Sequence, residues 1–360
     1  MFSLKDKKLA EEIVSKIKKL DLELKFMHVC GTHQDTLVKN GLDSLLKTCG
    51  VTIGQGPGCP VCVTTPKEIK EMLLLAKKGK IVTSFGDMIS VPGEKESLRN
   101  MKTQGYDVRT VYGIEDAVDI ARENPSREVV FMAVGFETTA PTTASIILKK
   151  PPDNFSILCC HRTIPPALKA IIKMGEIKID GFIQPGHVST IIGTEPYEFL
   201  SEKYNIAQVV AGFEPIDILM AVWMLVKQIQ NDKKFVQNEY FRAVHKNGNI
   251  KAKEVIDKVF KSLDIKWRGF PVIKDSGLEL KKEYEKYDSR IRFEDDLKEI
   301  KGKEYNEPSG CKCGEILRGL AEPQECPLFG KKCTPQLPVG PCMVSIEGSC
   351  NIEYRYRKIR

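Results

Sequence analysis

The first 230 residues of this 360-residue chain alternate short runs rich in Val and Ile with segments whose apolar residues recur at helical spacing. Such alternation is typical of parallel β-sheets flanked by helices, because parallel strands need a long crossover connection, usually a helix. Strands are predicted at residues 25–29, 80–85, 107–112, 128–134, 155–160, 180–184 and 207–212. Helices are predicted between them, at residues 66–79, 114–124, 141–150, 165–175 and 214–230.

The predicted strands are numerous enough for two α/β domains, which we place at residues 1–115 and 116–230. From about residue 231 the sequence becomes rich in Lys and Glu, and we expect helices there. After residue 310 it becomes a tail of cysteine, proline and glycine with little periodicity. Residues 231–360 are therefore predicted to form a third, helical and irregular domain. Its tail has too few apolar residues to organise itself, so a metal centre is the simplest element to hold it.

Charge and hydropathy narrow the class of protein. The formal net charge of +7 is modest, and Lys and Glu are intermixed, so no concentrated basic patch indicates nucleic-acid binding. No apolar run is long enough to span a bilayer. The first twenty residues place apolar side chains at helical spacing among charges, which predicts an amphipathic surface helix and not a secretory signal. We expect a cytoplasmic protein that binds neither nucleic acid nor membrane.

Twelve cysteines are unusual for such a protein. In a reducing compartment they favour metal or redox chemistry over a framework of disulfides. Six of them lie in the last fifty residues: Cys311, Cys313, Cys326, Cys333, Cys342 and Cys350. Iron–sulfur clusters take four thiolates at variable spacings, whereas zinc ribbons usually show two C-x-x-C knuckles, which this tail lacks. An iron–sulfur cluster beside a redox dithiol is therefore favoured over zinc.

Five polar motifs each follow a predicted strand and precede a helix. Ligands of open α/β sheets bind beyond the carboxyl ends of the strands, so these motifs are expected to converge on one edge. They are Cys30-Gly31-Thr32-His33, Gly86-Asp87-Met88, Gly135-Phe136-Glu137, Pro185-Gly186-His187 and Phe213-Glu214-Pro215.

Within these motifs, Cys30 and His33 could share a metal, or the imidazole could activate the thiolate. Both could instead be buried packing residues. His187 could bind a metal-linked anion or pair with the backbone, and Glu137 could hydrogen-bond a ligand, shuttle protons or cap the following helix.

Cys59 and Cys62 form a C-x-x-C pair in a loop of glycine and proline, just before a helix predicted to start at Pro66. A helix N-terminus lowers the pKa of a nearby thiol. Because no second close pair lies nearby, a redox dithiol is favoured over half of a zinc site. By contrast, Cys159 and Cys160 are adjacent on a strand and should point to opposite faces, which favours core packing over shared ligation.

Six motifs, spread in order over nearly the whole chain, resemble the HypD family of NiFe-hydrogenase maturation proteins. They are MHVCGTHQ (27–34), GPGCPVCVTTP (56–66), VGFETTAPTTA (134–144), QPGHVSTIIG (184–193), VVAGFEPIDIL (209–219) and CTPQLPVGPCMVSIEGSC (333–350). The resemblance implies two Rossmann-like α/β domains that face each other across a cleft, and a third domain that holds a 4Fe–4S cluster. It also implies a scaffold role, with a HypC-type partner, in building an iron that carries two cyanides and one carbon monoxide.

The resemblance also implies roles for individual residues. Cys30 would be the ligand of the assembled iron, with His33 as its neighbour, and Cys59 and Cys62 would be a thiol/disulfide pair. Cys313 and Cys342 would form a second dithiol, and Asp87, Glu137 and His187 would surround the iron. The cluster ligands would be Cys311, Cys326, Cys333 and Cys350.

A HypE-type protein would deliver cyanide as a thiocyanate. The alternative activity is that of a stand-alone iron–sulfur disulfide reductase, similar to ferredoxin–thioredoxin reductase. Whether the chain is an enzyme in its own right stays open at this point.

Overall fold

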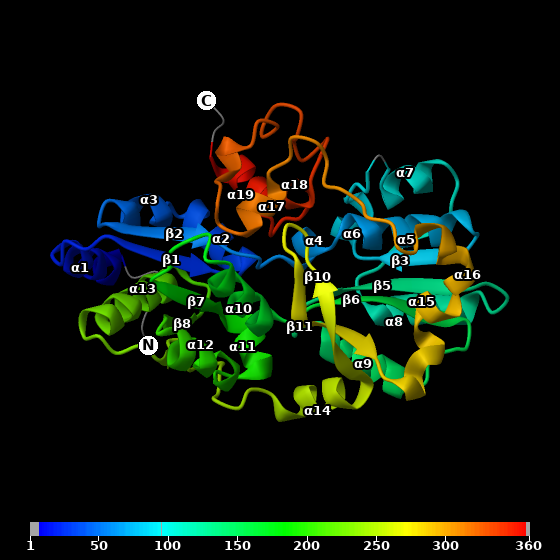
Figure 1. Ribbon diagram of the computed structural model, residues 1–360, viewed down its shortest axis with the longest axis horizontal. Helices are drawn as coiled ribbons and strands as arrows, with labels where there is room; N and C mark the ends of the chain where they lie inside the picture. Colours follow the sequence, from blue (N-terminus) through cyan, green and yellow to red (C-terminus); the bar gives the residue numbers. More distant parts are fainter. Residues whose placement is uncertain (1–6, 95, 358–360) are drawn as a thin grey trace.

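The computed structural model describes residues 7–94 and 96–357 and contains two parallel β-sheets side by side (Figure 1). Sheet A has the order β2-β1-β7-β8-β9 and sheet B the order β4-β3-β5-β6. The strands of sheet A are β1 (Leu24–His28), β2 (Val51–Gln55), β7 (Gly181–Pro185), β8 (Ala207–Ala211) and β9 (Val236–Asn238). Those of sheet B are β3 (Ile81–Ser84), β4 (Val108–Thr110), β5 (Val129–Gly135) and β6 (Phe155–His161). All seven predicted strands are confirmed.

The two sheets do not divide the chain at residue 115 as we expected. The chain leaves sheet A after β2, builds the whole of sheet B and returns to sheet A at β7, which pairs with β1 from Phe26–Gly181 to His28–Ile183. A boundary at residue 115 would fall between β4 and β5, which belong to the same sheet. Apolar alternation predicts which residues are strands, but the pairing of strands depends on contacts between distant segments.

The five predicted helices are confirmed as α5 (Pro66–Lys77), α8 (Ile114–Glu123), α9 (Ala140–Leu148), α10 (Ile164–Met174) and α13 (Pro215–Gln230). The N-terminal helix is α1 (Lys7–Lys18), and the first six residues of that prediction lie outside the described residues. The other helices of the α/β part are α2 (Gly31–Lys39), α3 (Leu42–Lys47), α4 (Pro60–Val63), α6 (Gly86–Ser90), α7 (Leu98–Thr103), α11 (Gly186–Ile192), η1 (Glu195–Tyr197) and α12 (Glu198–Tyr204). Within the described ranges, no helix has the length and apolar character that crossing a membrane requires.

Residues 231–305 differ from the prediction of Lys/Glu-rich helices. Only α14 (Ile250–Val259) is a helix of more than six residues there, and the chain then forms an antiparallel hairpin of β10 (Phe260–Lys266) and β11 (Val272–Leu280). The charged residues of β10 are exposed to solvent, as they would be on a surface helix. Charge composition alone therefore does not distinguish this strand from a solvated helix. Short helical turns follow: η2 (Lys282–Tyr287), α15 (Ser289–Arg292), α16 (Glu294–Leu297) and η3 (Lys298–Ile300).

The cysteine-rich tail, residues 306–357, forms a C-terminal lobe that lies above both sheets in Figure 1, coloured orange to red. Its helical turns are α17 (Cys313–Leu317), η4 (Pro323–Glu325), α18 (Pro341–Val344) and α19 (Ser349–Tyr356). In the lobe α19 packs on α2, and α18 packs on α4 and α6. The lobe therefore covers the elements that directly follow β1, β2 and β3.

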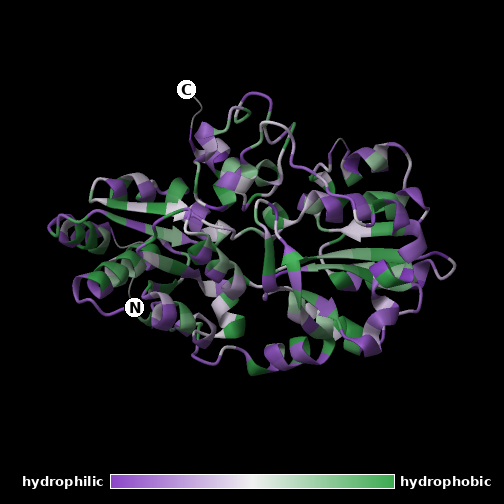
Figure 2. Ribbon diagram, viewed as in Figure 1, coloured by the Kyte–Doolittle hydropathy of each residue, from purple (hydrophilic) through white to green (hydrophobic). Residues whose placement is uncertain are grey.

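The apolar core explains how these parts hold together. One cluster of buried side chains runs from Met27 in sheet A through Val130 in sheet B to Met343 in the C-terminal lobe. In Figure 2 much of the strand ribbon is coloured hydrophobic, whereas the surrounding helices include many hydrophilic residues. Cys159 and Cys160 belong to different clusters on opposite faces of β6, which confirms the packing role predicted for them.

A buried network of ion pairs joins α5 to sheet B and to α15. Glu68 completes the capping box of α5 with Thr65, and its carboxylate accepts a hydrogen bond of 2.7 Å from the buried Arg162. Arg290 lies 3.9 Å from Glu68 and donates to Glu71 at 2.8 Å. Burial by itself raises the pKa of Glu68, but Arg162 and Arg290 outweigh it and hold that pKa below its usual 4.5.

Replacing this carboxylate should destabilise the fold strongly. We expect Glu68→Gln to lower the free energy of unfolding by roughly 3–5 kcal/mol, because it leaves the buried Arg162 without a counter-charge. Denaturant titration measures the change. Glu96→Gln is the matched control, since Glu96 makes an exposed pair with Lys77 and should cost about 1 kcal/mol at most.

The pH dependence of this difference has a definite sign. A carboxylate whose folded pKa is depressed stabilises the fold above its unfolded pKa of 4.5 and loses that effect as the pH falls towards the folded pKa. The gap in unfolding free energy between the wild type and Glu68→Gln should therefore be full at pH 7 and shrink below pH 4.5. A gap that widens on acidification would contradict the ion-pair account.

Candidate functional site

Cys30 stands at the carboxyl end of β1 and is fully buried, at the position that caps the N-terminus of α2. Burial raises the pKa of its thiol to about 12, and the nearby backbone N–H groups of His33 and Thr32 partly oppose that rise. The thiol is therefore protonated at neutral pH, and a thiolate would form there when a cation displaces the proton.

Two histidines lie near Cys30. The one beside its sulfur is His187, and not His33 as expected from the sequence. The Nδ1 atom of His187 is 3.7 Å from the sulfur of Cys30. The imidazole of His33 turns away and its Nε2 lies 2.9 Å from the carbonyl oxygen of Gly212. The ring of Phe213 packs against both imidazoles. Desolvation lowers the pKa of His33 to about 3 and that of His187 to about 4, so both rings are neutral at pH 7.

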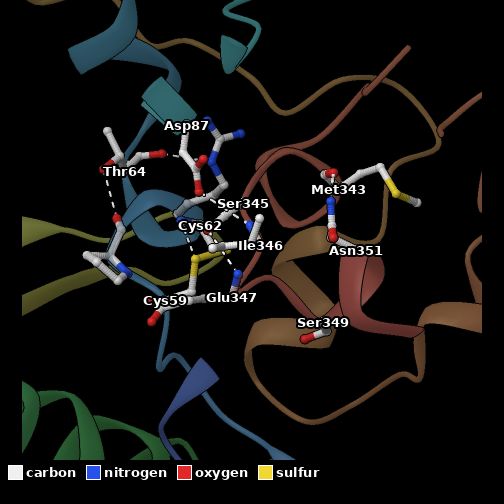
Figure 3. Close-up of a disulfide and its surroundings, with 12 residues drawn as sticks. Cys59, Cys62, Thr64, Asp87, Met343, Ser345, Ile346, Glu347, Ser349 and Asn351 are labelled. Atoms are coloured by element: carbon white, nitrogen blue, oxygen red, sulfur yellow. Dashed lines mark hydrogen bonds between the residues drawn. A yellow bond between two sulfur atoms is a disulfide. The ribbon is translucent and has the colours of Figure 1, made fainter. Parts of the chain in front are cut away.

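Cys59 and Cys62 follow β2, a strand that the sequence did not reveal, and they are joined as a disulfide (Figure 3). Both are fully buried, and the backbone N–H of Cys62 donates to the sulfur of Cys59 at 3.1 Å. Because β1 and β2 are parallel neighbours, the loops that follow them meet. A Cβ on Gly58 would stand 2.1 Å from the backbone nitrogen of Cys30, so only glycine permits this contact.

The C-terminal lobe closes the same region from above. A Cβ on Gly31 would stand 2.4 Å from Cβ of Glu347, so the loop after α18 touches the start of α2. Asp87, after β3, accepts a hydrogen bond of 3.3 Å from the backbone N–H of Ile346, beside the disulfide in Figure 3. Burial and the nearby Asp87 carboxylate raise the pKa of Glu347.

Glu137 lies on the side of sheet B, at the carboxyl end of β5, and is 4% exposed. Its Oε1 accepts a hydrogen bond of 2.8 Å from the N–H of Ile164, so it caps α10 and not the helix that directly follows it. Its Oε2 is buried without a hydrogen-bond partner, and desolvation raises the pKa of Glu137 to about 7. The charge of Glu137 contributes to raising the pKa of the buried Tyr197, which follows β7 of sheet A, so these two side chains lie within electrostatic range.

The six cysteines of the C-terminal lobe gather in one place. Five of them are buried, and Cys311 is half-buried. Burial raises the pKa of the Cys350 thiol, and so does the presence of four other lobe cysteines: Cys313, Cys333, Cys311 and Cys326. These sulfurs therefore lie within electrostatic range of Cys350. In the part of the chain that the structure describes, no group of three or more His, Cys, Asp or Glu side chains stands in an arrangement that could hold a metal ion.

By residue type, the lobe offers the cysteine thiols that an iron–sulfur cluster takes as ligands. A Cβ on Gly340 would come within 2.8 Å of the sulfur of Cys311, so the backbone of Gly340 packs directly against that thiol. The backbone N–H of Val339 points at the sulfur of Cys333 at 3.3 Å, the kind of hydrogen bond that tunes cluster thiolates. Zinc and iron–sulfur clusters both prefer such soft ligands.

Three residues of the site were missed from the sequence: Glu347, Tyr197 and Arg268. Arg268 is 1% exposed and donates from Nε to the carbonyl of Thr64 at 2.8 Å, just after the disulfide, while its Nη1 pairs with Glu307 before the first lobe cysteine. Glu347 lies within the motif CTPQLPVGPCMVSIEGSC (333–350), so that motif could have identified it. Nothing in the local sequence distinguishes Arg268 or Tyr197 from surface residues.

The close contact at Gly58 yields a test. We expect Gly58→Ala to force the two loops apart, to lower the free energy of unfolding by roughly 1–3 kcal/mol and to make the Cys30 thiol accessible to iodoacetamide. Mass spectrometry of the alkylated native protein measures the rate. Gly54→Ala is the control, because a Cβ there meets only one atom, at 3.9 Å. Equal alkylation of Cys30 in both variants would contradict the contact.

Comparison with known proteins agrees with these observations. A family model described as "HypD: Hydrogenase formation hypA family" matches residues 5–357. A putative hydrogenase expression/formation protein of Methanocaldococcus jannaschii is 48% identical over 365 residues, which cover 100% of both chains. Hydrogenase maturation factor HypD2 of Bradyrhizobium diazoefficiens is 44% identical, and HypD of Escherichia coli is 41% identical; each alignment covers 93% of this chain and 90% of the relative. The chain therefore belongs to the HypD family.

Proposed function

We propose that this protein is a hydrogenase maturation factor on which the iron of a NiFe-hydrogenase active site receives two cyanides and one carbon monoxide. One observation carries the proposal: the three chain segments that carry the thiols contact one another. Gly58 brings the Cys59–Cys62 loop against Cys30, and Glu347 brings the cysteine-rich lobe against Gly31. Family membership supports a role in hydrogenase maturation, and the thiols supply the chemistry.

Cys30 is the residue best suited to hold the iron that is being built. A low-spin iron with cyanide and carbon monoxide ligands needs soft donors and open positions, which a single buried thiolate provides. The N–H groups of Thr32 and His33 stabilise the thiolate once the iron displaces its proton. His187 lies 3.7 Å from the sulfur, and Asp87 accepts a hydrogen bond from Ile346, next to the Glu347 that contacts Gly31. These contacts support the proposal that both residues lie around the iron.

The electron balance assigns a role to Cys59 and Cys62. Release of cyanide from a thiocyanate, R–S–C≡N, breaks the sulfur–carbon bond and consumes two electrons. When Cys59 and Cys62 are reduced, two thiols plus R–S–C≡N yield R–SH, HCN and the Cys59–Cys62 disulfide, with atoms and electrons balanced. The disulfide is the form described here, and it must take up two electrons and two protons before another cyanide can be released.

The C-terminal lobe is placed to return those electrons. Cys311, Cys326, Cys333 and Cys350 would hold a 4Fe–4S cluster, which when bound supplies electrons one at a time. Cys342 donates a hydrogen bond to Cys313, which lowers the pKa of Cys313 and supports these two as the second dithiol. Arg268 contacts the backbone after the disulfide and also favours the thiolate of Cys313, so it links the two dithiols.

The partners follow from the chemistry. A HypE-type protein would present the thiocyanate and a HypC-type protein would share the iron, in the cytoplasm. Neither nucleic acid nor a membrane is required for these steps.

A second candidate activity is a stand-alone disulfide reductase, favoured by the contact between the Cys59–Cys62 disulfide and the cysteine lobe (Figure 3). Such an enzyme would reduce thioredoxin-like proteins with many turnovers and without a HypC-type partner. A turnover assay on the isolated chain, with reductant supplied, separates the two. The scaffold account expects no sustained turnover.

Removing the proposed iron ligand gives the most specific test of function. We expect Cys30→Ala, purified with its HypC-type partner, to lose the infrared bands of iron-bound cyanide and carbon monoxide completely. Its 4Fe–4S absorbance should be unchanged. The matched control is Cys49→Ala, because Cys49 is buried against α1 before β2 begins, at the end of that strand opposite to the Cys59–Cys62 loop. If the bands survive in Cys30→Ala, the assignment of this ligand is wrong.

A further inference from the structure

A groove outside the thiol site runs between α10, α12 and the start of β11, three elements near the centre of Figure 1. Its volume is about 660 Å³. The floor is apolar and is made of half-buried and exposed side chains from all three elements. These are Pro166, Ala170, Met174, Phe199, Tyr204 and Val272, which we call the α10 groove.

The apolar residues of α10 in the floor are spaced so that a partner helix could pack along them. Pro166, Ala170 and Met174 are spaced four residues apart and so form one stripe along α10. Val272, at the lip of the groove, is 61% exposed. Large apolar side chains with this exposure, next to a concave apolar floor, are typical of interaction surfaces.

Four lysines surround the α10 groove: Lys169, Lys173, Lys203 and Lys274. All four are exposed, and none of them makes an ion pair with any carboxylate in residues 7–94 and 96–357. Lys169 lies 6.0 Å above the ring of Phe199, over the floor itself. The single carboxylate at the rim is Asp275, so the rim carries a net charge of +3 from four lysines and one aspartate.

We propose that the α10 groove binds an amphipathic helix of a partner protein whose apolar stripe is flanked by Asp and Glu. The stripe of α10 matches the i, i+4 spacing of apolar anchors on such a helix. The lysines at the rim complement acidic flanks and would steer the encounter. An anionic membrane is a poorer fit, because a membrane-binding face presents protruding apolar side chains and not a concave floor.

The groove is separate from the thiols but shares a helix with the site. The first N–H of α10, that of Ile164, is the group that Glu137 caps. α10 is also the helix through which the chain passes from β6 of sheet B back to β7 of sheet A. A partner bound along α10 would therefore sit at the junction of the two sheets.

A pair of synthetic peptides tests the proposal. The acidic peptide is a fluorescent helical peptide with Leu at i, i+4 and i+7 and Glu on both flanks, and its twin carries Lys in place of every Glu. Fluorescence anisotropy with the full chain at low salt should show saturable binding of the acidic peptide. The basic twin should bind at least about tenfold more weakly.

Variants locate the binding site. We expect Lys169→Glu/Lys173→Glu to weaken the acidic peptide at least about tenfold and to strengthen the basic twin, a swap that loss of folding does not produce. Lys251→Glu/Lys258→Glu changes the same net charge on α14 and should leave both affinities unchanged. Ala170→Trp should block both peptides by filling the groove.

Three results overturn the proposal. The first is that the acidic peptide does not bind, and the second is that it binds equally to all variants. The third is that the wild-type chain instead sediments with phosphatidylglycerol vesicles, in a way that Lys169→Glu/Lys173→Glu abolishes. None of these outcomes depends on the iron chemistry proposed above.

Discussion

The structure depends on the close approach of two loops that follow neighbouring parallel strands. β1 and β2 pair in register, so the chain beyond each emerges at the same edge, and Gly58 lies directly against the backbone of Cys30. No other residue type fits at position 58 without moving one loop. This contact joins a buried single thiol to a disulfide pair, and the C-terminal lobe can then close over both through Glu347 and Gly31.

Burial controls the chemistry of the groups gathered there. It raises the pKa of Cys30 to about 12 and that of Glu137 to about 7, and it lowers the pKa of His187 to about 4. Burial therefore favours the uncharged form of each of these three groups until a cation or a ligand arrives. Arg268 and the ion pairs around Glu68 behave differently, because these buried groups keep their charges and are paired. Their hydrogen bonds fix the chain segments around the site in position.

Much of this arrangement could be predicted from the sequence, for physical reasons that also explain the gaps. Long apolar runs such as residues 128–134 predict strands, and polar motifs that directly follow strands are candidates for a site, so Cys30, Asp87, Glu137 and His187 could be named in advance. The expectation of a single edge was wrong, because Cys30 and His187 follow strands of sheet A, whereas Asp87 and Glu137 follow strands of sheet B. β2 was missed because VTIGQ is short and half polar. The return of β7 to sheet A and the turn of His187, instead of His33, towards Cys30 depend on tertiary contacts that no local pattern encodes.

The proposed function requires that four cysteines of the lobe hold an iron–sulfur cluster, and that electrons stored in the lobe reach the disulfide beside Cys30. Quantifying iron, acid-labile sulfide and zinc in the anaerobically purified protein tests this most directly. We predict about four irons and four sulfides per chain and no stoichiometric zinc. One zinc per chain without sulfide, or a colourless protein whose lobe thiols all react freely with an alkylating reagent in the native state, would contradict the account.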